Sequence, residues 1–394
     1  MMTLVAILFW LSAGLIFYTH FGYTVALWVL GAMGFSNGAG HLRGRKVGRF
    51  PSLVGDTDTD ETALPMVSLI IAAYNEEAVI ANRIENALEL EYPRELLEII
   101  VASDGSTDTT VEIAREAGAD QVLDLPRGGK ITVQNAAAAA AKGQILAFSD
   151  ANSQWKPDAL AELLEPFRDD RVGYVCGQVR FTGPEGGNLE GFYWRYEMKV
   201  RELESELAGV TAGNGAIYAV RAADYIELRP SGSHDLSFPF ALARKGLASL
   251  YRPRAEASEK MVPSMEGELS RKRRMMVGLW DIVIGERMAD PRGYPVLFYF
   301  EIVSHRLLRY LTPFLHLIAL ITNVILIGQG LVYEVALFVQ LAVLLAAVLG
   351  RWFDLLPLRI CRYYVMTTVS IALGFWDRWR NGPPGYWEKA EGTR

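Results

Sequence analysis

Three carboxylates at the ends of apolar runs constrain the fold more than any other feature of this sequence. Asp104 ends "IIVASD", Asp150 ends "ILAFSD", and Asp235 stands in "SGSHDLSFP". A carboxylate beside a buried strand is costly unless it is paired, hydrogen-bonded or bound to a cation. Open α/β sheets bind ligands at the carboxyl ends of their strands. The pattern therefore predicts one polar site, shared by three acids, at the edge of a sheet.

Strand and helix patterns alternate through the first part of the polar region. The runs "MVSLIIAAY", "LEIIVASDG", "ADQVLDL" and "QILAFSDAN" are typical of buried strands, and the segments between them have helical spacing. This alternation predicts an α/β fold with a mostly parallel sheet and flanking helices. Beyond Trp155 we expect strands at "VGYVCGQVRF", "GNGAIYAVR" and 246–252, and a long helix over 189–207.

Apolar stretches at both ends indicate transmembrane helices. Residues 4–33 exceed the length of about 20 residues that spans a bilayer, and we expect a tilt or kink near Gly22. Two further spans are expected over 311–327 and 335–349, whereas 364–375 is short and is interpreted as re-entrant or interfacial.

Charge and cysteine content narrow the class of protein. The formal net charge of -6 argues against a general nucleic-acid binder. Cys176 and Cys361 lie far apart, which argues against a disulfide framework or a zinc site.

The basic run over 43–49, just after the first apolar stretch, predicts a cytoplasmic flank and an external amino terminus. Residues 266–288, with a basic cluster, suit a helix on a membrane surface.

The segment "AAYNEE" is expected to form a turn at the edge of the sheet. Tyr74 could stack on a base and Glu76 could accept from ribose hydroxyls, although Asn75 and Glu76 could equally cap a helix. Asp104 can accept an amide or imide proton of a base. The turn "RGGK" presents Lys130, which suits a diphosphate but is also common in surface loops.

The remaining candidates suit a cation, a proton transfer and phosphate binding. Asp150 and Asn152 could together hold a hard cation, with an Asx-turn as the structural alternative. Asp235 is the candidate general base, and His234 is set aside because adjacent side chains usually diverge. Arg271 and Arg274 are three residues apart, so they share a helical face that could bind phosphate oxygens, or anionic lipid instead.

These motifs together resemble those of an inverting, nucleotide-sugar-dependent family 2 glycosyltransferase with the GT-A fold. The resemblance runs from about Met66 to Gly278, with membrane segments placed as in the polysaccharide-synthase branch. "AAYNEE", from Ala72, resembles the opening nucleotide-binding segment, and "SDGSTD" the second acidic motif. "GGK" resembles the segment whose lysine lies near the diphosphate. "SDAN" resembles the metal-binding DxD, "HD" the ED motif, and "RKRRM" the QxxRW motif in register.

The resemblance implies a role for each of these residues. Asp104 would contact the base of the nucleotide, and Lys130, Arg271 and Arg274 would lie near its phosphates. Asp150 would bind Mg²⁺ or Mn²⁺, and Asp235 would act as the general base of the reaction. Two positions depart from the family pattern, namely Asn152 in place of the second Asp of DxD and Met275 in place of the Trp of QxxRW. These departures argue against a processive synthase of the cellulose or hyaluronan type.

The expected organisation has six parts. They are an N-terminal transmembrane helix (1–36), a basic flank and acidic linker (37–65), a cytoplasmic catalytic domain (66–260), interfacial helices (261–305), C-terminal transmembrane or interfacial helices (306–376) and a cytoplasmic tail (377–394). The resemblance implies transfer from a nucleotide sugar, with UDP as the expected nucleotide, to a lipid-linked or saccharide acceptor at a bacterial inner membrane, in contact with membrane lipids. The alternative is a non-catalytic membrane subunit of a polysaccharide-assembly complex.

Overall fold

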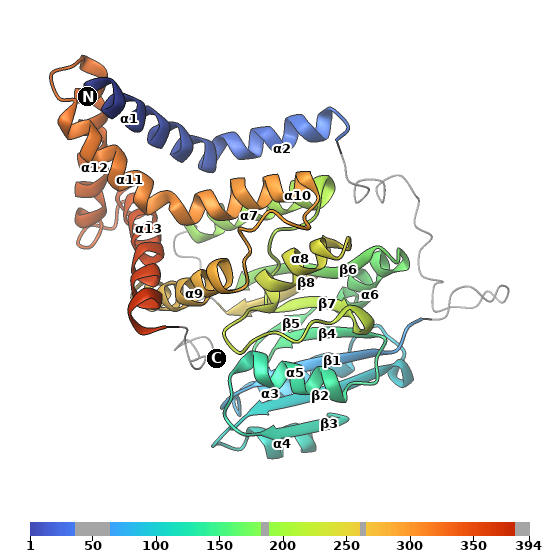
Figure 1. Ribbon diagram of the computed structural model, residues 1–394. Helices are drawn as coiled ribbons and strands as arrows, with labels where there is room; N and C mark the ends of the chain where they lie inside the picture. Colours follow the sequence, from blue (N-terminus) through green and yellow to red (C-terminus); the bar gives the residue numbers. More distant parts are fainter. Residues whose placement is uncertain (36–63, 183–188, 261–264, 383–394) are drawn as a thin grey trace.

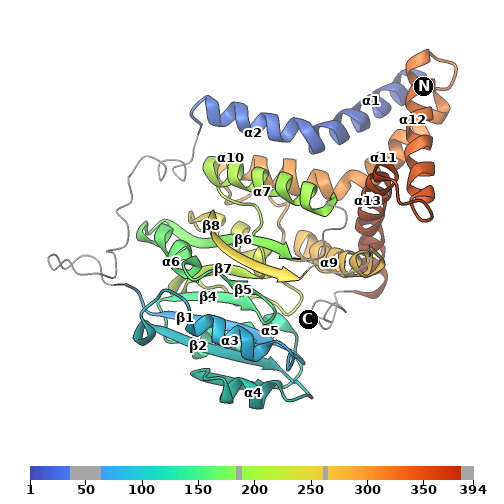
Figure 2. The same ribbon diagram turned by 180° about the vertical axis from the view of Figure 1, so that it is seen from behind.

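The computed structural model describes residues 1–35, 64–182, 189–260 and 265–382 (Figure 1). Within these ranges an eight-stranded sheet forms the centre of one domain. Long apolar helices from both ends of the chain lie together along one side of that domain (Figures 1 and 2). The basic run over 43–49 and the acidic linker after it lie outside the described residues.

The sheet is mostly parallel in its first half, as predicted. Its order is β3-β2-β1-β4-β7-β6-β8-β5, in which β3, β2, β1 and β4 are mutually parallel and β7 is antiparallel to both of its neighbours. β6 and β8 are parallel, and β5 is antiparallel to β8. The strands are β1 (Val67–Ala73), β2 (Leu97–Asp104), β3 (Gln121–Leu125), β4 (Ile145–Asp150), β5 (Gln154–Trp155), β6 (Val172–Thr182), β7 (Ile217–Arg221) and β8 (Ala248–Lys260).

Helices cover both faces of this sheet and extend into the apolar layer. In the domain they are α3 (Ile80–Leu88), α4 (Thr110–Glu116), α5 (Lys130–Ala140), α6 (Ala159–Leu164), α7 (Leu189–Leu207) and α8 (His234–Arg244). The others are α1 (Met2–Phe17), α2 (Tyr23–Ala32), α9 (Met265–Gly285), α10 (Val296–Glu301), α11 (Leu308–Ile325), α12 (Leu331–Leu349) and α13 (Leu356–Asn381). Short 3-10 turns lie at Arg94–Leu96, Glu165–Arg168 and Ala222–Asp224.

Alternate side chains of the central strands pack into two separate cores. In β1, Leu69 and Ile71 pack with α3, α4 and α6, whereas Ile70 packs on the other face with α5 and α8. This alternation follows from the two-residue period of a strand. Both faces of the sheet are therefore covered, and the polar residues that end the strands lie along the edge of the sheet.

Three described helical stretches are long and apolar enough to cross a membrane: Met2–Ala32, Val296–Ile325 and Leu331–Leu349. In the first, a π-helical turn at Tyr18–Gly22 separates α1 from α2, where a kink was expected. The second begins well before the expected start at Leu311, because α10 continues through another π-helical turn (Ile302–Leu307) into α11. α13 is not one of these stretches.

α13 packs along α9, which lies beside the sheet domain (Figure 1). Lys272 Nζ donates to the hydroxyl of Tyr363 at 2.6 Å. Arg273 forms a two-pronged ion pair with Asp377 at 2.6 and 2.8 Å. Two members of the basic cluster on α9 are thus engaged by another helix of the chain.

Candidate functional site

Parallel pairing brings two of the predicted acids to one edge of the sheet. β1 lies between β2 and β4, and Ala72 pairs with Ala102 on one side and with Asp150 on the other. Asp104 ends β2 and Asp150 ends β4. The two carboxylates therefore stand on either side of the end of β1, with the turn after β1 between them.

Asp104 is held by the turn that precedes α5. One carboxylate oxygen accepts the backbone N–H groups of Gly128 at 2.6 Å and Gly129 at 2.9 Å. The other oxygen pairs with the guanidinium of Arg127. That guanidinium also lies over the ring of Tyr74, 3.4 Å from its centroid. Arg127 therefore links two residues that the sequence singled out, and its position in the "RGGK" turn was the available signal.

The close approach of this turn to β2 requires glycine at position 105. Gly105 has a positive φ of 66°, and a Cβ there would lie 2.8 Å from the backbone nitrogen of Arg127. A side chain at this position would push the turn away from Asp104. The glycine of "SDG" thus permits the contact between Asp104 and the residues before α5.

Lys130 and Asp150 form an ion pair at the centre of the edge. The segment before β7 lies against the pair, since a Cβ on Gly215 would lie 3.4 Å from Lys130 Nζ and 3.9 Å from Asp150 Oδ2. Burial disfavours the ammonium, but the carboxylate of Asp150, and then those of Asp235 and Glu259, raise the pKa of Lys130 above its ordinary value. A lysine held in this way stays charged and can interact with a phosphate.

The third acid, Asp235, reaches the same region from the first turn of α8. Its carboxylate accepts the hydroxyl of Ser233, and its backbone carbonyl accepts the N–H of Gly213 at 2.7 Å. The segment before β7 links Asp235 to the ion pair, since Gly213 donates to Asp235 and a Cβ on Gly215 would lie 3.4 Å from Lys130 Nζ.

His234 points the opposite way, into the core. It is 3% exposed, and its Nδ1 lies 2.7 Å from the hydroxyl of Tyr218. Burial, followed by the charge of Lys130, lowers the pKa of His234 well below its ordinary value. A neutral, buried imidazole beside the site fits the expectation that this histidine is not the base.

The turn after β1 is held by polar contacts to the turn after β2. Asn75, which has a positive φ of 53°, accepts the backbone N–H of Thr107 at 2.8 Å. The backbone N–H of Glu76 donates to the hydroxyl of Thr110 at 2.8 Å, and Glu76 is only 4% exposed. Asn75 therefore has a clear structural role here, and little of Glu76 is open to a ligand.

Asn152 lies beside a polar groove of 410 Å³. The groove runs between α3 and the ends of β6 and β8, and its lining includes Asn82, Gln154 and Glu259. The described residues hold no cluster of three or more His, Cys, Asp or Glu side chains that could bind a metal ion. Asp150 and Asn152 therefore fit a hard cation only if a bound diphosphate or water supplies the other ligands.

The arginines of the "RKRRM" segment lie on α9. The side chains of Arg271 and Arg274 are outside the described part of the structure, so their predicted contact with phosphates remains a prediction. Met275, which stands at the position of the family tryptophan, is 48% exposed.

Comparison with known proteins shows that residues 68–228 match the family described as glycosyl transferase family 2. The beta-monoglucosyldiacylglycerol synthase of Nostoc sp. is 28% identical over 264 residues, which cover 60% of this chain and 55% of that protein. The hyaluronan synthase of Pasteurella multocida is 29% identical over 143 residues, 35% of this chain and 14% of that protein. The chain thus spans about half the length of the first of these relatives and much less of the second.

A solved structure shares the fold over nearly the whole chain. It is a mannosyltransferase from Pyrobaculum calidifontis in complex with GDP-mannose and Mn²⁺, 20% identical in sequence, with a TM-score of 0.64. The match covers 91% of this chain and 98% of the other, so it includes the helices outside the sheet domain. The expected GT-A fold, with apolar helices at both ends, is confirmed.

Proposed function

We propose that this chain, whose residues 68–228 match the family 2 glycosyltransferases, transfers a sugar from a nucleotide donor, a UDP-sugar, with inversion at the anomeric carbon. The acceptor is a lipid-linked or growing saccharide of the cell envelope. The reaction takes place at the cytoplasmic face of a bacterial inner membrane, with the apolar helices in the bilayer.

One observation carries this proposal: Lys130 and Asp150 pair at the carboxyl edge of the sheet, and residues 213–215 connect this pair to Asp235. A diphosphate needs a cation, and an acceptor hydroxyl needs a base. This arrangement offers both within one small region.

In the proposed reaction Asp235 accepts the proton of an acceptor hydroxyl. The hydroxyl oxygen forms a bond to the anomeric carbon while the bond from that carbon to the donor diphosphate breaks, and the diphosphate keeps the electron pair. A single displacement of this kind inverts the configuration. Lys130 offsets the negative charge that develops on the departing diphosphate.

The remaining residues would hold the donor. Ala72, Tyr74, Glu76 and Asp104 would surround the nucleoside, and Arg271 and Arg274 would contact phosphates. Asp150 and Asn152 would hold Mg²⁺ or Mn²⁺, which when bound adds to the charge stabilisation at the diphosphate. Membrane-spanning helices beside the site favour an acceptor that is itself anchored in lipid, as is the product named for the Nostoc relative.

The test is nucleotide release by the full chain purified in detergent. UDP- and GDP-sugars are supplied in turn with Mg²⁺ or Mn²⁺, with and without chelator, and with diacylglycerol or polyprenyl-phosphate-linked sugars as acceptors. We expect release with one UDP-sugar, dependent on metal and stimulated by a lipid acceptor. No release with any donor in the presence of membrane lipids would contradict the proposal and favour a non-catalytic subunit.

A further inference from the structure

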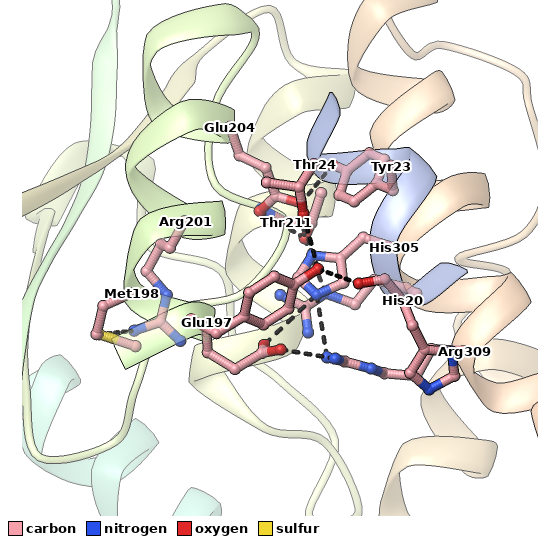
Figure 3. Close-up of polar contacts among 12 residues, drawn as sticks. His20, Tyr23, Thr24, Glu197, Met198, Arg201, Glu204, Thr211, His305 and Arg309 are labelled. Carbon is pink, nitrogen blue, oxygen red and sulfur yellow. Dashed lines mark hydrogen bonds and ion pairs between the residues drawn. The ribbon is translucent and has the colours of Figure 1, made fainter. Parts of the chain in front are cut away.

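A buried polar cluster joins the catalytic domain to the apolar helices (Figure 3). We call it the junction cluster. It contains side chains from α2, from α7, from the segment after α7, and from the helix formed by α10 and α11: Tyr23, Glu197, Arg201, Glu204, Thr211, His305, Arg306 and Arg309. Buried charges on this scale are costly unless each is matched by a partner.

Glu204 is the centre of the junction cluster and is fully buried, with 0% exposure. Its carboxylate accepts the hydroxyl of Tyr23 at 2.7 Å and lies 2.6 Å from Nδ1 of His305. The same carboxylate accepts the hydroxyl of Thr211 at 3.0 Å. One carboxylate of the catalytic domain therefore binds two membrane helices and the segment that leads into β7.

Thr211 receives a second contact from the membrane side. Nε of Arg306 donates to its hydroxyl oxygen at 2.8 Å, and its own N–H donates to Glu204 at 3.3 Å. Thr211 is 0% exposed. A hydroxyl that is buried and bonded on both sides holds its backbone in one position, because losing either bond leaves a buried polar group unmatched.

The other end of this segment touches the candidate site. The N–H of Gly213 donates to the carbonyl of Asp235 at 2.7 Å, and the carbonyl of Gly213 accepts from Arg201 at 2.9 Å. Gly215 lies against Lys130 and Asp150, with 3.4 Å from its ideal Cβ position to the lysine Nζ. Residues 211–215 thus run from the membrane helices to the proposed base and cation.

We propose that Thr211 is a positioning residue for glycosyl transfer, anchored by Glu204 and Arg306. Through residues 213 and 215 it fixes Asp235 relative to Lys130 and Asp150, so the docked membrane helices set the geometry of the site. Thr211 touches neither donor nor acceptor in this role. The inference rests on the proposed transferase function, and it adds that catalysis depends on the junction cluster.

The expected effect is on turnover rather than on donor affinity. A displacement of reacting groups by about 1 Å lowers a rate by up to about 100-fold. Thr211→Val keeps the shape of the side chain and removes its hydroxyl, so we expect kcat to fall about 10- to 100-fold. The donor KM and the stoichiometry of donor binding should match the wild type. Thr211→Ser keeps the hydroxyl and should retain most of kcat.

A matched control is Glu202→Gln. Glu202 lies on the same helix and forms an exposed ion pair with Lys199 at 2.8 Å, outside the junction cluster. This variant should keep the wild-type kcat and nearly the wild-type unfolding temperature. Unfolding temperature and donor-binding stoichiometry, measured by calorimetry on each variant, separate lost positioning from lost folded protein.

Each outcome either supports or overturns the positioning role of Thr211. A wild-type chain that transfers sugar while Thr211→Val keeps its kcat would overturn the positioning role alone. A wild-type chain that transfers nothing would overturn the proposed function, and the positioning role with it. If Thr211→Val does not fold, Tyr23→Phe is the second variant, because it removes the hydrogen bond that Glu204 accepts from α2. A lower kcat with unchanged donor binding in that variant would support the role, and an unchanged kcat would overturn it.

Discussion

Asp104 and Asp235 are both acids at the candidate site, but their carboxylates are held in different ways. Asp104 is buried, and its oxygens are engaged by Gly128, Gly129 and Arg127. Asp235 is partly exposed and receives the hydroxyl of Ser233. An acceptor hydroxyl could reach the partly exposed carboxylate of Asp235, whereas the oxygens of buried Asp104 are already engaged within the chain. The difference therefore favours Asp235 as the base and Asp104 as the organiser of the donor site.

Asp235→Asn should abolish transfer and spare donor binding. The amide preserves the shape and the backbone contact to Gly213, but it cannot take a proton, so we expect release of nucleotide to fall by about 10²- to 10⁴-fold. Nucleotide release and calorimetric donor binding on the same preparation check this. Donor binding that falls in parallel with release would show that Asp235 binds the donor instead.

Asp150→Ala should remove the metal dependence of donor binding. The substitution deletes the proposed metal ligand and the partner of Lys130, so donor affinity in Mn²⁺ should fall at least about tenfold and no longer respond to chelator. Asp124→Ala is the matched control, since Asp124 is an exposed carboxylate on the nearby strand β3. A persistent response of the Asp150 variant to chelator would rule out Asp150 as the ligand.

The helices and strands with a strong periodicity of apolar residues could be predicted from the sequence. Features that depend on contacts between distant parts of the chain could not. The strands that end in Asp104 and Asp150 follow from their apolar runs, and their common edge follows from parallel pairing. The pairing of Arg127 with Asp104 depends on how the turn before α5 folds back onto β2. The spacing of these two residues along the chain does not reveal the contact, because the contact forms only when the turn packs against the sheet.

The segment before β7 should not tolerate a side chain at position 213. A Cβ on Gly213 would lie 1.8 Å from the hydroxyl oxygen of Tyr174. Gly213→Ala should therefore displace the segment that contacts Asp235, and we expect a loss of stability of about 1 to 3 kcal/mol together with reduced turnover. Thermal unfolding and nucleotide release measure the two effects.

Tyr174→Phe supplies the internal control for that prediction. The Tyr174 hydroxyl is buried and has no hydrogen-bond partner among the described residues, so its removal alone should be nearly neutral. The double variant should recover part of the stability lost in Gly213→Ala. Equal losses with and without the hydroxyl would mean that another contact constrains position 213.

The pairing of α9 with α13 depends on close backbone approach at Gly374. A Cβ there would lie 2.4 Å from Cβ of Met276, so Gly374→Val should force the two helices apart and lower the unfolding temperature. Gly31→Val in α2 is the control, because nothing lies within 4 Å of a Cβ at that position. Similar unfolding temperatures for both variants would contradict tight packing of α13 on α9.

At the scale of the whole molecule, the sequence separates a membrane part from a catalytic part, and the structure joins them through buried charge. Long apolar runs predicted the helices that are long enough to cross a membrane, whereas nothing in the sequence indicated the contact between Glu204 and His305. Their separation along the chain is large, and a lone Glu on an amphipathic helix is usually solvated. Buried polar contacts thus hold the two parts together, and their union should depend on ionisation of the junction cluster.

Glu204 should make the stability of the whole chain sensitive to acid. Burial alone would raise its pKa, but the charges of His305 and Arg306 and the bonds from His305 and Tyr23 lower the pKa of Glu204 from 4.5 to about 2. Because the folded-state pKa is the lower one, the stabilisation is complete above pH 4.5 and is lost as the pH falls towards 2.

Glu204→Gln should accordingly destabilise the chain at pH 7 by about 1 to 3 kcal/mol, the cost of leaving a buried donor without its acceptor. The difference from wild type in thermal unfolding, measured in detergent, should shrink as the pH falls below 4.5. Glu202→Gln on the same helix is the control, because the exposed pair of Glu202 with Lys199 contributes about 0 to 1 kcal/mol. If the Glu204 variant differed from wild type by the same amount at pH 3 as at pH 7, ionised Glu204 would not be what holds the two parts together.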